Sequence, residues 1–467
     1  MAQDVSYDLA VLGAGSGGMA AAKRAREAGL SVVQFERGAT GGTCVNRGCV
    51  PKKLLVHASR RGDALRDAAN LGWSTGKLSF DWPTLRERVR TSVEELSRSQ
   101  RDTLEEAGIV YVEGEARLIA PDRVRTGDGT EYRARHVIVA TGSRPLVPDL
   151  PGHEHALVSD DLFGLEALPR RLAMIGGGYI AVEFGCLFHR LGVDVTIFES
   201  AGRLLDNFEE EIVERLQSRM EAEGVTVHTG TEAACIAKGS AEGDEGPYAI
   251  ELEDGSRHAG FDAVALLIGR APNTEDIGLE DIGVTLDEHG QISVDEHGRT
   301  AVANVFAIGD VARRLQLTPV AIASGHDAVD AILGRAVEPI VETRVPSAVF
   351  ATPELGSVGL DEAEARERGL AVEVRRTEFE PLAEMLAERD ATLLVKLVVE
   401  RGSGTVLGLH LCGENAAEFA QLGALLIEAG ATERDFHRTI GLHPTDAEEI
   451  VGLGEAARPV GETDGTG

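Results

Sequence analysis

Residues 6–36, SYDLAVLGAGSGGMAAAKRAREAGLSVVQFE, follow the pattern of an apolar strand, a glycine-rich turn, a helix and a second apolar strand. Gly13, Gly15 and Gly18 fit the spacing G-x-G-x-x-G, and the second strand ends in an acid, Glu36. Such glycines let a pyrophosphate approach the backbone at the helix N-terminus, and the acid accepts hydrogen bonds from a ribose. The stretch therefore predicts a dinucleotide-binding unit.

The same pattern recurs at residues 170–199, RRLAMIGGGYIAVEFGCLFHRLGVDVTIFE. Gly176, Gly178 and Ala181 form the second fingerprint, and its second strand ends in Glu199. Two such units in one chain predict two bound dinucleotides. The alternative is a two-domain protein with a single cofactor.

A pair of cysteines follows the first unit within the segment GGTCVNRGCV, residues 41–50. Two thiols beside a redox cofactor can reduce a disulfide by thiol–disulfide exchange, so we interpret Cys44 and Cys49 as a redox pair. A metal half-site and two unrelated buried thiols are the alternatives. Zinc would need two more ligands at short spacing, and no metal site is expected. The other cysteines are scattered singly: Cys186, Cys235 and Cys412.

The length of 467 residues suits about three domains, and 43% hydrophobic content suits a globular protein. No run of 18 apolar residues is present, which argues against a membrane span. The start, MAQDVSYDLAVLG, lacks a basic segment and leads directly into a strand, so we expect a cytoplasmic protein. In that reducing compartment a cysteine pair is more often catalytic than structural.

Asp and Glu total 77 against 46 for Lys and Arg, a formal net charge of −31. Six of the basic residues are lysines: Lys23, Lys52, Lys53, Lys77, Lys238 and Lys396. This excess of negative charge disfavours nucleic acid and anionic membranes as partners. Salt relieves self-repulsion, so both a high-salt cytoplasm and a merely acidic, soluble protein are compatible with the composition.

Further motifs lie between and after the two units. HVIVATGSRPLVP, residues 136–148, predicts a strand that ends in Ala140-Thr141-Gly142. LLIGRAPNT (266–274) and VFAIGDVA (305–312) follow, and Asp310 after a hydrophobic strand is well placed to meet a hydroxyl-rich cofactor chain. From about Arg344 short strands and a helix-rich run lead to GLHPTDAEEI and to a tail, GETDGTG, that is expected to be disordered.

GGTCVNRGCVPKKLL, ATGSRP, GGGYIAVEFG, IGRAPNT, VFAIGDVA, LTPVAIA and HPTDAEE resemble, in this order, the motifs of the glutathione reductase group of pyridine nucleotide–disulfide oxidoreductases. The likeness runs from Tyr7 to about Val451. It implies an α/β fold with two Rossmann-like domains, for FAD and NAD(P)H, and a C-terminal α+β dimerisation domain. The expected boundaries are 1–150 for the first part of the FAD domain, 151–273 for the NAD(P)H domain, 274–343 for the returning central segment, and 344–467 for the dimerisation domain with its tail.

The resemblance also assigns catalytic roles. It implies that Cys44 attacks the substrate disulfide, and that Cys49 lies next to the flavin and forms a charge-transfer complex as a thiolate. A helix N-terminus or a nearby cation favours the thiolate. Lys52 is expected near the flavin, paired with Glu183 because a buried charge needs a partner, with a solvated lysine as the alternative. Tyr179 resembles the lid of the nicotinamide pocket, with a core tyrosine as the alternative.

In the same family, the histidine of the segment GLHPTDAEE is the general acid–base. His443 therefore resembles this group and Glu448 the carboxylate that orients its ring, since imidazole titrates near neutral pH. By residues alone, a histidine before proline is as often structural. The family's histidine serves the cysteines of the other subunit, so the resemblance implies a homodimer.

The remaining positions that resemble the family's cofactor contacts are spread over both units and the return segment. They are Gly13, Gly15, Ser16, Gly17, Gly18, Glu36, Gly42, Thr43, Lys53, Ala116, Thr141, Gly142, Gly176, Gly178, Ile180, Glu199, Arg270, Gly309, Asp310 and Thr318.

Two departures from the family pattern bear on specificity. NADPH-using members place arginines after the second strand of the nicotinamide unit, where this chain has Ser200 and Asp206. Glu199 at the strand end can bond both ribose hydroxyls and repels a phosphate, which predicts a preference for NADH. Arg203 nearby, and Ala181 in place of the third glycine, leave room for NADPH.

The second departure concerns the substrate. The family's glutathione-binding arginines correspond to Lys23 and His326, and its substrate-site tyrosines to Ser92 and Gln100. An ammonium or imidazole captures a carboxylate less well than a bidentate guanidinium does. We therefore expect glutathione disulfide or a close analogue, such as an amide or a γ-glutamylcysteine dimer, as the substrate.

Other functions compete with a reductase of this type. Dihydrolipoamide dehydrogenase shares the architecture and prefers NAD, which fits Glu199, but GCVPKK and LTPVAIA resemble the glutathione branch more. Mercuric reductase would need an additional C-terminal cysteine pair, which this tail lacks. A flavin-binding redox sensor without turnover is the non-enzymatic alternative.

Overall fold

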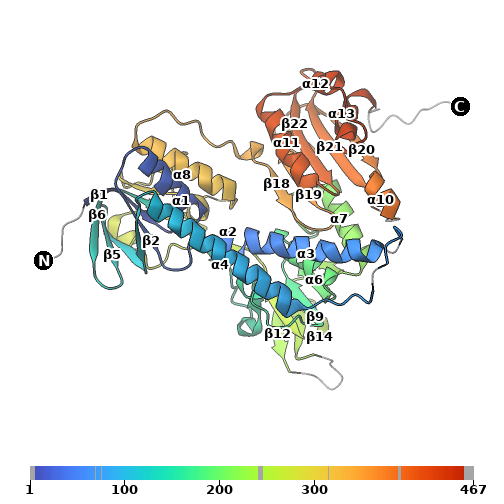
Figure 1. The fold of residues 1–467 in the computed structure, drawn as a ribbon, viewed down its shortest axis with the longest axis horizontal. Helices are drawn as coiled ribbons and strands as arrows, with labels where there is room; N and C mark the ends of the chain where they lie inside the picture. Colours follow the sequence, from blue (N-terminus) through green and yellow to red (C-terminus); the bar gives the residue numbers. More distant parts are fainter. Residues whose placement is uncertain are drawn as a thin grey trace.

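A computed structural model describes residues 6–456 except 69, 75, 240–245, 314 and 388–390, so the tail GETDGTG lies outside the described residues. A largely parallel sheet with two antiparallel edge strands, a fully parallel second sheet and an antiparallel C-terminal sheet are joined around central helices (Figure 1). Within the described ranges, every helix is too short or too polar to cross a bilayer.

The first sheet is built from the N-terminal unit. Its strands are β1 (Ser6–Leu12), β2 (Val32–Glu36), β3 (Val110–Glu113), β4 (Ala116–Ala120), β5 (Arg123–Thr126), β6 (Glu131–Val139) and β17 (Val305–Ala307). They lie in the order β3-β2-β1-β6-β5-β4, and β17 returns to pair with β6 in parallel. β6 ends at Val139 rather than at the predicted 140–142, because the chain there turns through Gly142 with φ +68°.

Helix α1 (Ser16–Glu27) follows β1 and packs against α8 (Thr318–Ile332) (Figure 1). Small residues make this packing close: a Cβ on Gly325 would lie 2.6 Å from the carbonyl oxygen of Gly17. The return segment is thereby held against the first unit.

The second sheet repeats this architecture. Its strands are β8 (Leu157–Val158), β9 (Arg171–Ile175), β10 (Asp194–Glu199), β11 (Thr226–Thr229) and β15 (Ala263–Leu266), in the order β11-β10-β9-β15-β8. Helices α5 (Ser159–Leu162), α6 (Tyr179–Arg190) and α7 (Glu210–Glu223) accompany it. A three-stranded sheet joins β12 (Ala233–Lys238), β13 (Tyr248–Leu252) and β14 (Arg257–Phe261), and β7 (Ser143–Pro145) pairs with β16 (Arg270–Pro272) where the chain enters and leaves this region.

The C-terminal sheet is antiparallel and has the order β18-β19-β22-β21-β20. Its strands are β18 (Ser347–Val349), β19 (Leu355–Gly359), β20 (Val372–Phe379), β21 (Leu393–Glu400) and β22 (Val406–Cys412). The accompanying helices are α9 (Glu362–Glu367), α10 (Leu382–Ala387), α11 (Ala416–Glu428), α12 (Glu433–Arg438) and α13 (Ala447–Ala456). Helix α11 covers one face, and α7 of the second unit contacts β19 and β22 (Figure 1).

Three helices near the centre connect these regions: α2 (Gly42–Arg47), α3 (Cys49–Asp67) and α4 (Trp82–Glu106). Helix α3 runs below the C-terminal sheet and contacts α6 (Figure 1). One apolar core joins residues of α3, the second sheet and the C-terminal sheet, including Leu55, Phe188 and Leu355. The regions therefore share a core around α3.

Candidate active site

The two cysteines of the predicted redox pair lie at the break between α2 and α3. Cys44 is on α2, and α3 begins at Cys49. The break occurs at Gly48, where a Cβ would lie 2.8 Å from the carbonyl oxygen of Thr43. Both cysteines are free thiols; Cys44 is half-buried and Cys49 exposed. The Cys49 Sγ lies 3.9 Å from the Thr318 Oγ1, at the first residue of α8.

The two thiols have opposite pKa shifts. The hydrogen bond from Cys44 lowers the pKa of Cys49 to about 6; burial opposes this, and the Lys52 ammonium and Thr318 hydroxyl add to it. The same hydrogen bond and burial raise the pKa of Cys44. In the reduced pair the negative charge therefore lies on Cys49, near the N-terminus of α8, whose dipole also favours an anion.

Lys52 and Glu183 form a buried ion pair between α3 and α6. The Lys52 Nζ lies 2.7 Å from the Glu183 Oε1. The same oxygen accepts a hydrogen bond from the Phe350 backbone N–H at 2.8 Å, and Lys52 also lies 4.3 Å from the Phe350 ring centroid. Three regions of the chain thus hold one ammonium one helical turn from Cys49.

Lys53 takes a different position from Lys52. Its Nζ lies 3.6 Å from the Phe350 ring centroid and 3.7 Å from a carboxylate oxygen of Glu354. Burial lowers the pKa of Lys53. The motifs gave no indication of Glu354 or Phe350, because these residues lie about 300 positions away in a segment without a distinctive pattern.

The first fingerprint forms a tight turn at the start of α1. Gly13 has φ +105°, and a Cβ there would lie 2.3 Å from the Ala140 carbonyl oxygen. Helix α1 begins after Gly15 without a side-chain cap. The Glu36 carboxylate accepts the Ala14 N–H at 2.7 Å and the Gly38 N–H at 2.8 Å. The predicted neighbours Ser16, Gly17 and Gly18 form the first turn of α1.

Two glycines of the cysteine segment come close to this turn. Gly41 forms an isolated parallel β-bridge with Gly15. A Cβ on Gly42 would lie 2.8 Å from the Gly15 Cα. The predicted Ala116 begins β4, and the segment before it lies near Glu36 because the Gly114 N–H donates to the Glu36 carbonyl at 2.8 Å.

A polar network gathers several other predicted cofactor residues. Arg270 donates to the Ser143 hydroxyl at 2.8 Å, and that hydroxyl donates to the Asp310 carboxylate at 2.7 Å. Arg270 also lies 3.5 Å from the Thr43 hydroxyl. The Thr141 hydroxyl donates to the Asn273 carbonyl oxygen at 2.7 Å. The predicted Gly142 and Gly309 both take positive φ beside this network, at +68° and +67°.

The second fingerprint has the same geometry as the first. Gly176 has φ +110°, α6 begins after Gly178 without a side-chain cap, and the space beside Gly178 is open. The Glu199 carboxylate accepts the Gly177 N–H, as Glu36 accepts that of Ala14. Tyr179 and Ile180 form the start of α6, and the Tyr179 side chain remains 44% exposed.

The loop after Glu199 binds its own arginine. The Arg203 guanidinium donates to the carbonyl oxygens of Phe208 at 3.0 Å and of Asp206 at 2.6 Å. Glu199 further accepts the Ala201 N–H at 2.6 Å. Arg203 is therefore committed to the backbone of residues 200–208.

His443 and Glu448 form a pair just before and within α13. The His443 Nδ1 lies 2.9 Å from the Glu448 Oε1, and the histidine side chain is 81% exposed. Helix α13 lies at the outer end of the C-terminal sheet, away from α2 (Figure 1). Within the described residues, no hydrogen bond joins His443 to Cys44 or Cys49 of the same chain.

The four predicted substrate residues lie on three helices. Lys23 is on α1 and His326 on the adjacent α8, whereas Ser92 and Gln100 are on α4. Gln100 is next to the cysteine segment, because a Cβ on Gly41 would lie 2.6 Å from its amide oxygen. The arrangement brings Gln100 close to α2, and Ser92 is exposed two turns away.

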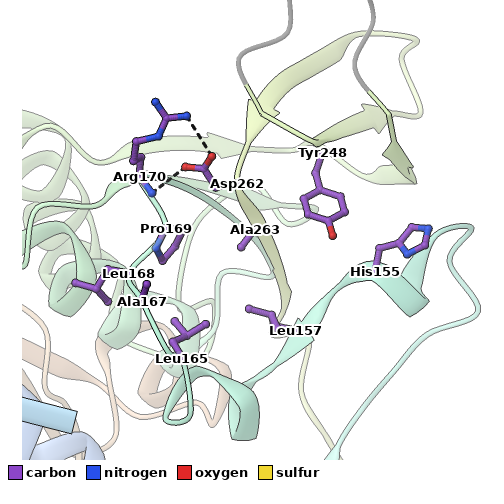
Figure 2. A pocket seen from close by; sticks show the side chains of 10 residues that line it. All are labelled: His155, Leu157, Leu165, Ala167, Leu168, Pro169, Arg170, Tyr248, Asp262 and Ala263. Atoms are coloured by element: carbon purple, nitrogen blue, oxygen red, sulfur yellow. Dashed lines mark hydrogen bonds and ion pairs between the residues drawn. The ribbon is translucent and has the colours of Figure 1, made fainter. Parts of the chain in front are cut away.

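A cavity of about 520 Å³ lies elsewhere, at the β8 edge of the second sheet (Figure 2). Leu157, Leu165 and Leu168 line its base, and Tyr248 lies across from Asp262, which binds Arg170 (Figure 2). None of the predicted site residues lines it.

Comparisons with known proteins agree with this geometry. A family model described as pyridine nucleotide–disulphide oxidoreductase matches residues 7–325, and the dimerisation-domain model of that family matches residues 345–453. The chain is 41% identical over 451 residues to glutathione reductase of Burkholderia cepacia, covering 97% of this chain and 99% of that protein.

Two further relatives match over similar lengths. The chloroplastic/mitochondrial glutathione reductase of Pisum sativum is 37% identical over 470 residues, with 98% of this chain and 84% of that protein covered. Trypanothione reductase of Trypanosoma congolense is 35% identical over 482 residues, with 96% and 95% covered. The chain therefore belongs to the pyridine nucleotide–disulfide oxidoreductases, in the group that resembles glutathione reductase.

Proposed function

We propose that this protein is an FAD-dependent NAD(P)H:disulfide oxidoreductase that reduces glutathione disulfide or a close analogue. The observation that carries the proposal is the thiol pair, in which the pKa of Cys49 is lowered by Cys44 and Lys52. A thiolate held beside an ammonium and hydrogen-bonded to a second thiol is suited to thiol–disulfide exchange.

The residues present fit two dinucleotides. Both α1 and α6 begin after a glycine without a side-chain cap, Gly15 and Gly178, and each fingerprint turn lies beside an acid, Glu36 or Glu199. Free backbone N–H groups at a helix N-terminus suit a pyrophosphate. When bound, the flavin and nicotinamide supply the hydride and electron transfer that reduces the cysteine disulfide. Thr43, Arg270 and Asp310 are proposed to hold the flavin side, and Lys52 with Glu183 its reactive edge.

The exchange reaction requires the two cysteines to act in turn. Cys44 loses its proton to His443 of the partner subunit and attacks one substrate sulfur, so a Cys44–substrate bond forms and the substrate S–S bond breaks. The leaving thiolate takes the proton from that histidine. The Cys49 thiolate then attacks the Cys44 sulfur, which restores the Cys44–Cys49 disulfide and releases the second thiolate for protonation.

Exposure of the acid–base pair supports a homodimer. The His443 side chain is 81% exposed, and two apolar neighbours, Ile440 and Leu442, are 94% and 75% exposed. Large apolar side chains gathered on a surface mark an interaction site. We propose that this surface packs on a second copy and places His443 beside the partner's thiols, so each site is incomplete without the other subunit.

NADH is the proposed preferred reductant. The fingerprint pattern predicts that Glu199 bonds the ribose, and its negative charge opposes a 2′-phosphate. Arg203, the one arginine left within residues 200–208, is committed to two backbone carbonyls of that loop. Ser200 and Asp206 occupy the two positions at which NADPH-using members of the family have arginines for the 2′-phosphate.

We propose that the preferred substrate is an analogue of glutathione disulfide in which the glycine carboxylate is modified or missing. Lys23 and His326 lie on the packed helices α1 and α8, and neither offers a bidentate fork for a carboxylate. Ser92 and Gln100 add hydrogen-bonding groups without aromatic surface. An amide of glutathione or a γ-glutamylcysteine dimer meets these conditions.

The domain boundaries and the location in the cell belong to the same proposal. We assign residues 1–150 and 274–343 to the FAD-binding part, 151–273 to the NAD(P)H-binding part, and 344–467 to the dimerisation part. A reductase of small disulfides suits a cytoplasm that keeps thiols reduced.

A steady-state assay tests the proposal. The purified holoprotein is given NADH or NADPH with each of three disulfides: oxidised glutathione, its bis-amide and bis-γ-glutamylcysteine. We expect turnover of at least one disulfide, with kcat/KM higher for NADH. A tenfold higher kcat/KM for NADPH would overturn the proposed preference for NADH. Good turnover of oxidised glutathione, but of neither of the two other disulfides, would overturn the proposal of a glutathione analogue as substrate. Reduction of the flavin without turnover of any disulfide would favour a redox sensor.

A further inference from the structure

One lysine is buried in the C-terminal sheet, far from the cysteines in sequence. Lys396 lies on β21, where Leu394, Val395, Leu397 and Val398 around it are fully buried. Its own side chain is 8% exposed. Six of the 46 basic residues of this chain are lysines, and this one is a compact ammonium enclosed by apolar strand residues.

The ammonium is neutralised by the start of helix α7 in the second unit. The Lys396 Nζ lies 2.5 Å from the Glu209 Oε1 and 2.8 Å from the Glu211 Oε2, and the Glu209 side chain is also 8% exposed. Burial lowers the pKa of Lys396, but the two carboxylates outweigh burial and raise it. Lys396 is thus a fixed charge that ties the C-terminal sheet to α7.

Glu209 also directly follows the loop 200–208, which begins after Glu199, the acid proposed to bind the ribose. Its Oε2 caps α7 by accepting the Ile212 N–H at 3.1 Å. The carbonyl oxygen of the preceding residue, Phe208, accepts a hydrogen bond from the Arg203 guanidinium at 3.0 Å. Further back, the Leu205 N–H donates to the Gly177 carbonyl at 3.0 Å.

The loop 200–208 is therefore held at both ends. Gly177 of the fingerprint turn accepts from Leu205 and donates to the Glu199 carboxylate. Leu205 itself has φ +48°, a left-handed conformation that a leucine keeps only when its surroundings impose it. The fixed position of Glu209 is one such constraint, because only three residues separate it from Leu205.

We infer that Lys396 is a positioning residue for the nicotinamide dinucleotide: through Glu209 it holds the loop 200–208 and Glu199 in the geometry that binds the adenosine ribose. The inference rests on the proposed function of the second unit. It assigns to the C-terminal sheet a role in dinucleotide affinity in addition to its place in the dimer. Lys396 is not among the predicted cofactor residues and acts through Glu209.

The test compares two substitutions of a cation by methionine in the same sheet. Lys396→Met removes the ion pairs between β21 and the start of α7, while Arg376–Glu211 and Arg215–Glu378 still join β20 to that helix. Arg375→Met is the control, since Arg375 is a cation on the neighbouring strand whose side chain is 14% exposed and which binds Glu433 at 2.5 Å and Glu373 at 2.8 Å, away from α7. Binding of NAD⁺ to the oxidised holoprotein is measured by calorimetry, alongside KM for NADH and for the disulfide.

We expect Lys396→Met to raise the dissociation constant of NAD⁺ and the KM for NADH about tenfold, a usual size for coupling between separate sites. KM for the disulfide stays unchanged, and Arg375→Met leaves NAD⁺ binding as in wild type. Equal weakening by both variants, or an unchanged dissociation constant in Lys396→Met, would overturn the inference.

Lys396→Met leaves the Glu209 and Glu211 carboxylates without this ammonium, and an uncompensated buried charge is itself destabilising. A second variant therefore removes the lysine and both carboxylates together. In Lys396→Met/Glu209→Gln/Glu211→Gln, the amide oxygen of residue 209 can still cap α7, but the tie to β21 is absent. We expect the same weak NAD⁺ binding, and wild-type affinity there would contradict us. If neither NADH nor NADPH reduces the flavin of the wild-type protein, the proposed function is rejected. If the wild-type flavin is reduced normally and the variants bind NAD⁺ as tightly as wild type, only the inference about Lys396 is rejected.

Discussion

Cys44 and Cys49 are chemically alike, yet their surroundings give them different charges. The thiol of Cys44 donates to Cys49, and Lys52 adds a positive charge one turn further along α3. The resulting division of labour is that Cys49 holds the negative charge at neutral pH, while Cys44 needs a base before it can attack. An exposed histidine from a second subunit fits that need.

Removing the donor should raise the pKa of Cys49. In Cys44→Ala the largest of the stabilising contributions is lost, so we expect the pKa to move from about 6 toward that of an ordinary thiol. The measurement is the pH dependence of iodoacetamide alkylation of the reduced protein. Cys44→Ser keeps a donor and serves as the control. An alkylation midpoint that stays near 6 in the alanine variant would show that another group sets it.

Substitution of the histidine should separate the two halves of the reaction. We expect His443→Gln to lower kcat/KM for the disulfide by roughly 10²–10⁴, the usual contribution of a general acid–base. Reduction of the flavin by NADH without disulfide should keep its wild-type rate in stopped-flow measurements. Glu448→Gln, which still accepts a hydrogen bond from the ring, should lose less. Slower flavin reduction in His443→Gln would place the histidine elsewhere in the mechanism.

The proposed preference for NADH rests on Glu199 and on the loop between β10 and α7. Replacing Glu199 by valine and Ser200 by arginine removes the charge that opposes a 2′-phosphate and adds one that binds it. We expect the ratio of kcat/KM for NADPH over NADH to rise by about 10² or more, since two opposed charges change. Ser200→Ala, with the acid kept, should leave the ratio unchanged. A ratio unaffected by the double change would move the specificity to other residues.

The packing of α1 on α8 depends on two small residues. Alanine at Gly325 places a Cβ 2.6 Å from the Gly17 carbonyl, which requires the helices to separate. We expect Gly325→Ala to lower the free energy of unfolding by about 1–3 kcal/mol, as overpacking does. Gly452→Ala is the control, because nothing lies within 4 Å of its Cβ position. Denaturant unfolding of both variants checks this; equal effects would mean that the contact is unimportant.

Sequence patterns predicted the elements that bind cofactors better than the contacts between regions. Both strand–turn–helix–strand units are present, because glycine spacing and apolar alternation are local properties of the chain. The partners of Lys53 and Lys396 could not be predicted, since Glu354 and Glu209 lie in segments without a distinctive pattern. Such pairs depend on how separate sheets pack, which a single sequence does not encode in any spacing.

The net charge of −31 acts on the molecule as a whole. Self-repulsion destabilises the compact state, and salt screens it over about 10 Å at 0.1 M. We therefore expect the melting temperature to rise with KCl concentration, measured by calorimetry on the holoprotein. Sucrose at matched osmolality is the control for effects unrelated to charge. A melting temperature that does not respond to KCl would mean that self-repulsion contributes little to the stability.

The scarcity of lysine decides where amine chemistry can reach this protein. Lys52, Lys53 and Lys396 are held by carboxylates within the fold, whereas Lys77 and Lys238 project into solvent. An acylating dye or an activated bead would therefore attach at a few defined outer points and leave the buried ammonium groups untouched. Labelled or immobilised samples would consequently carry their attachments at a small set of known positions.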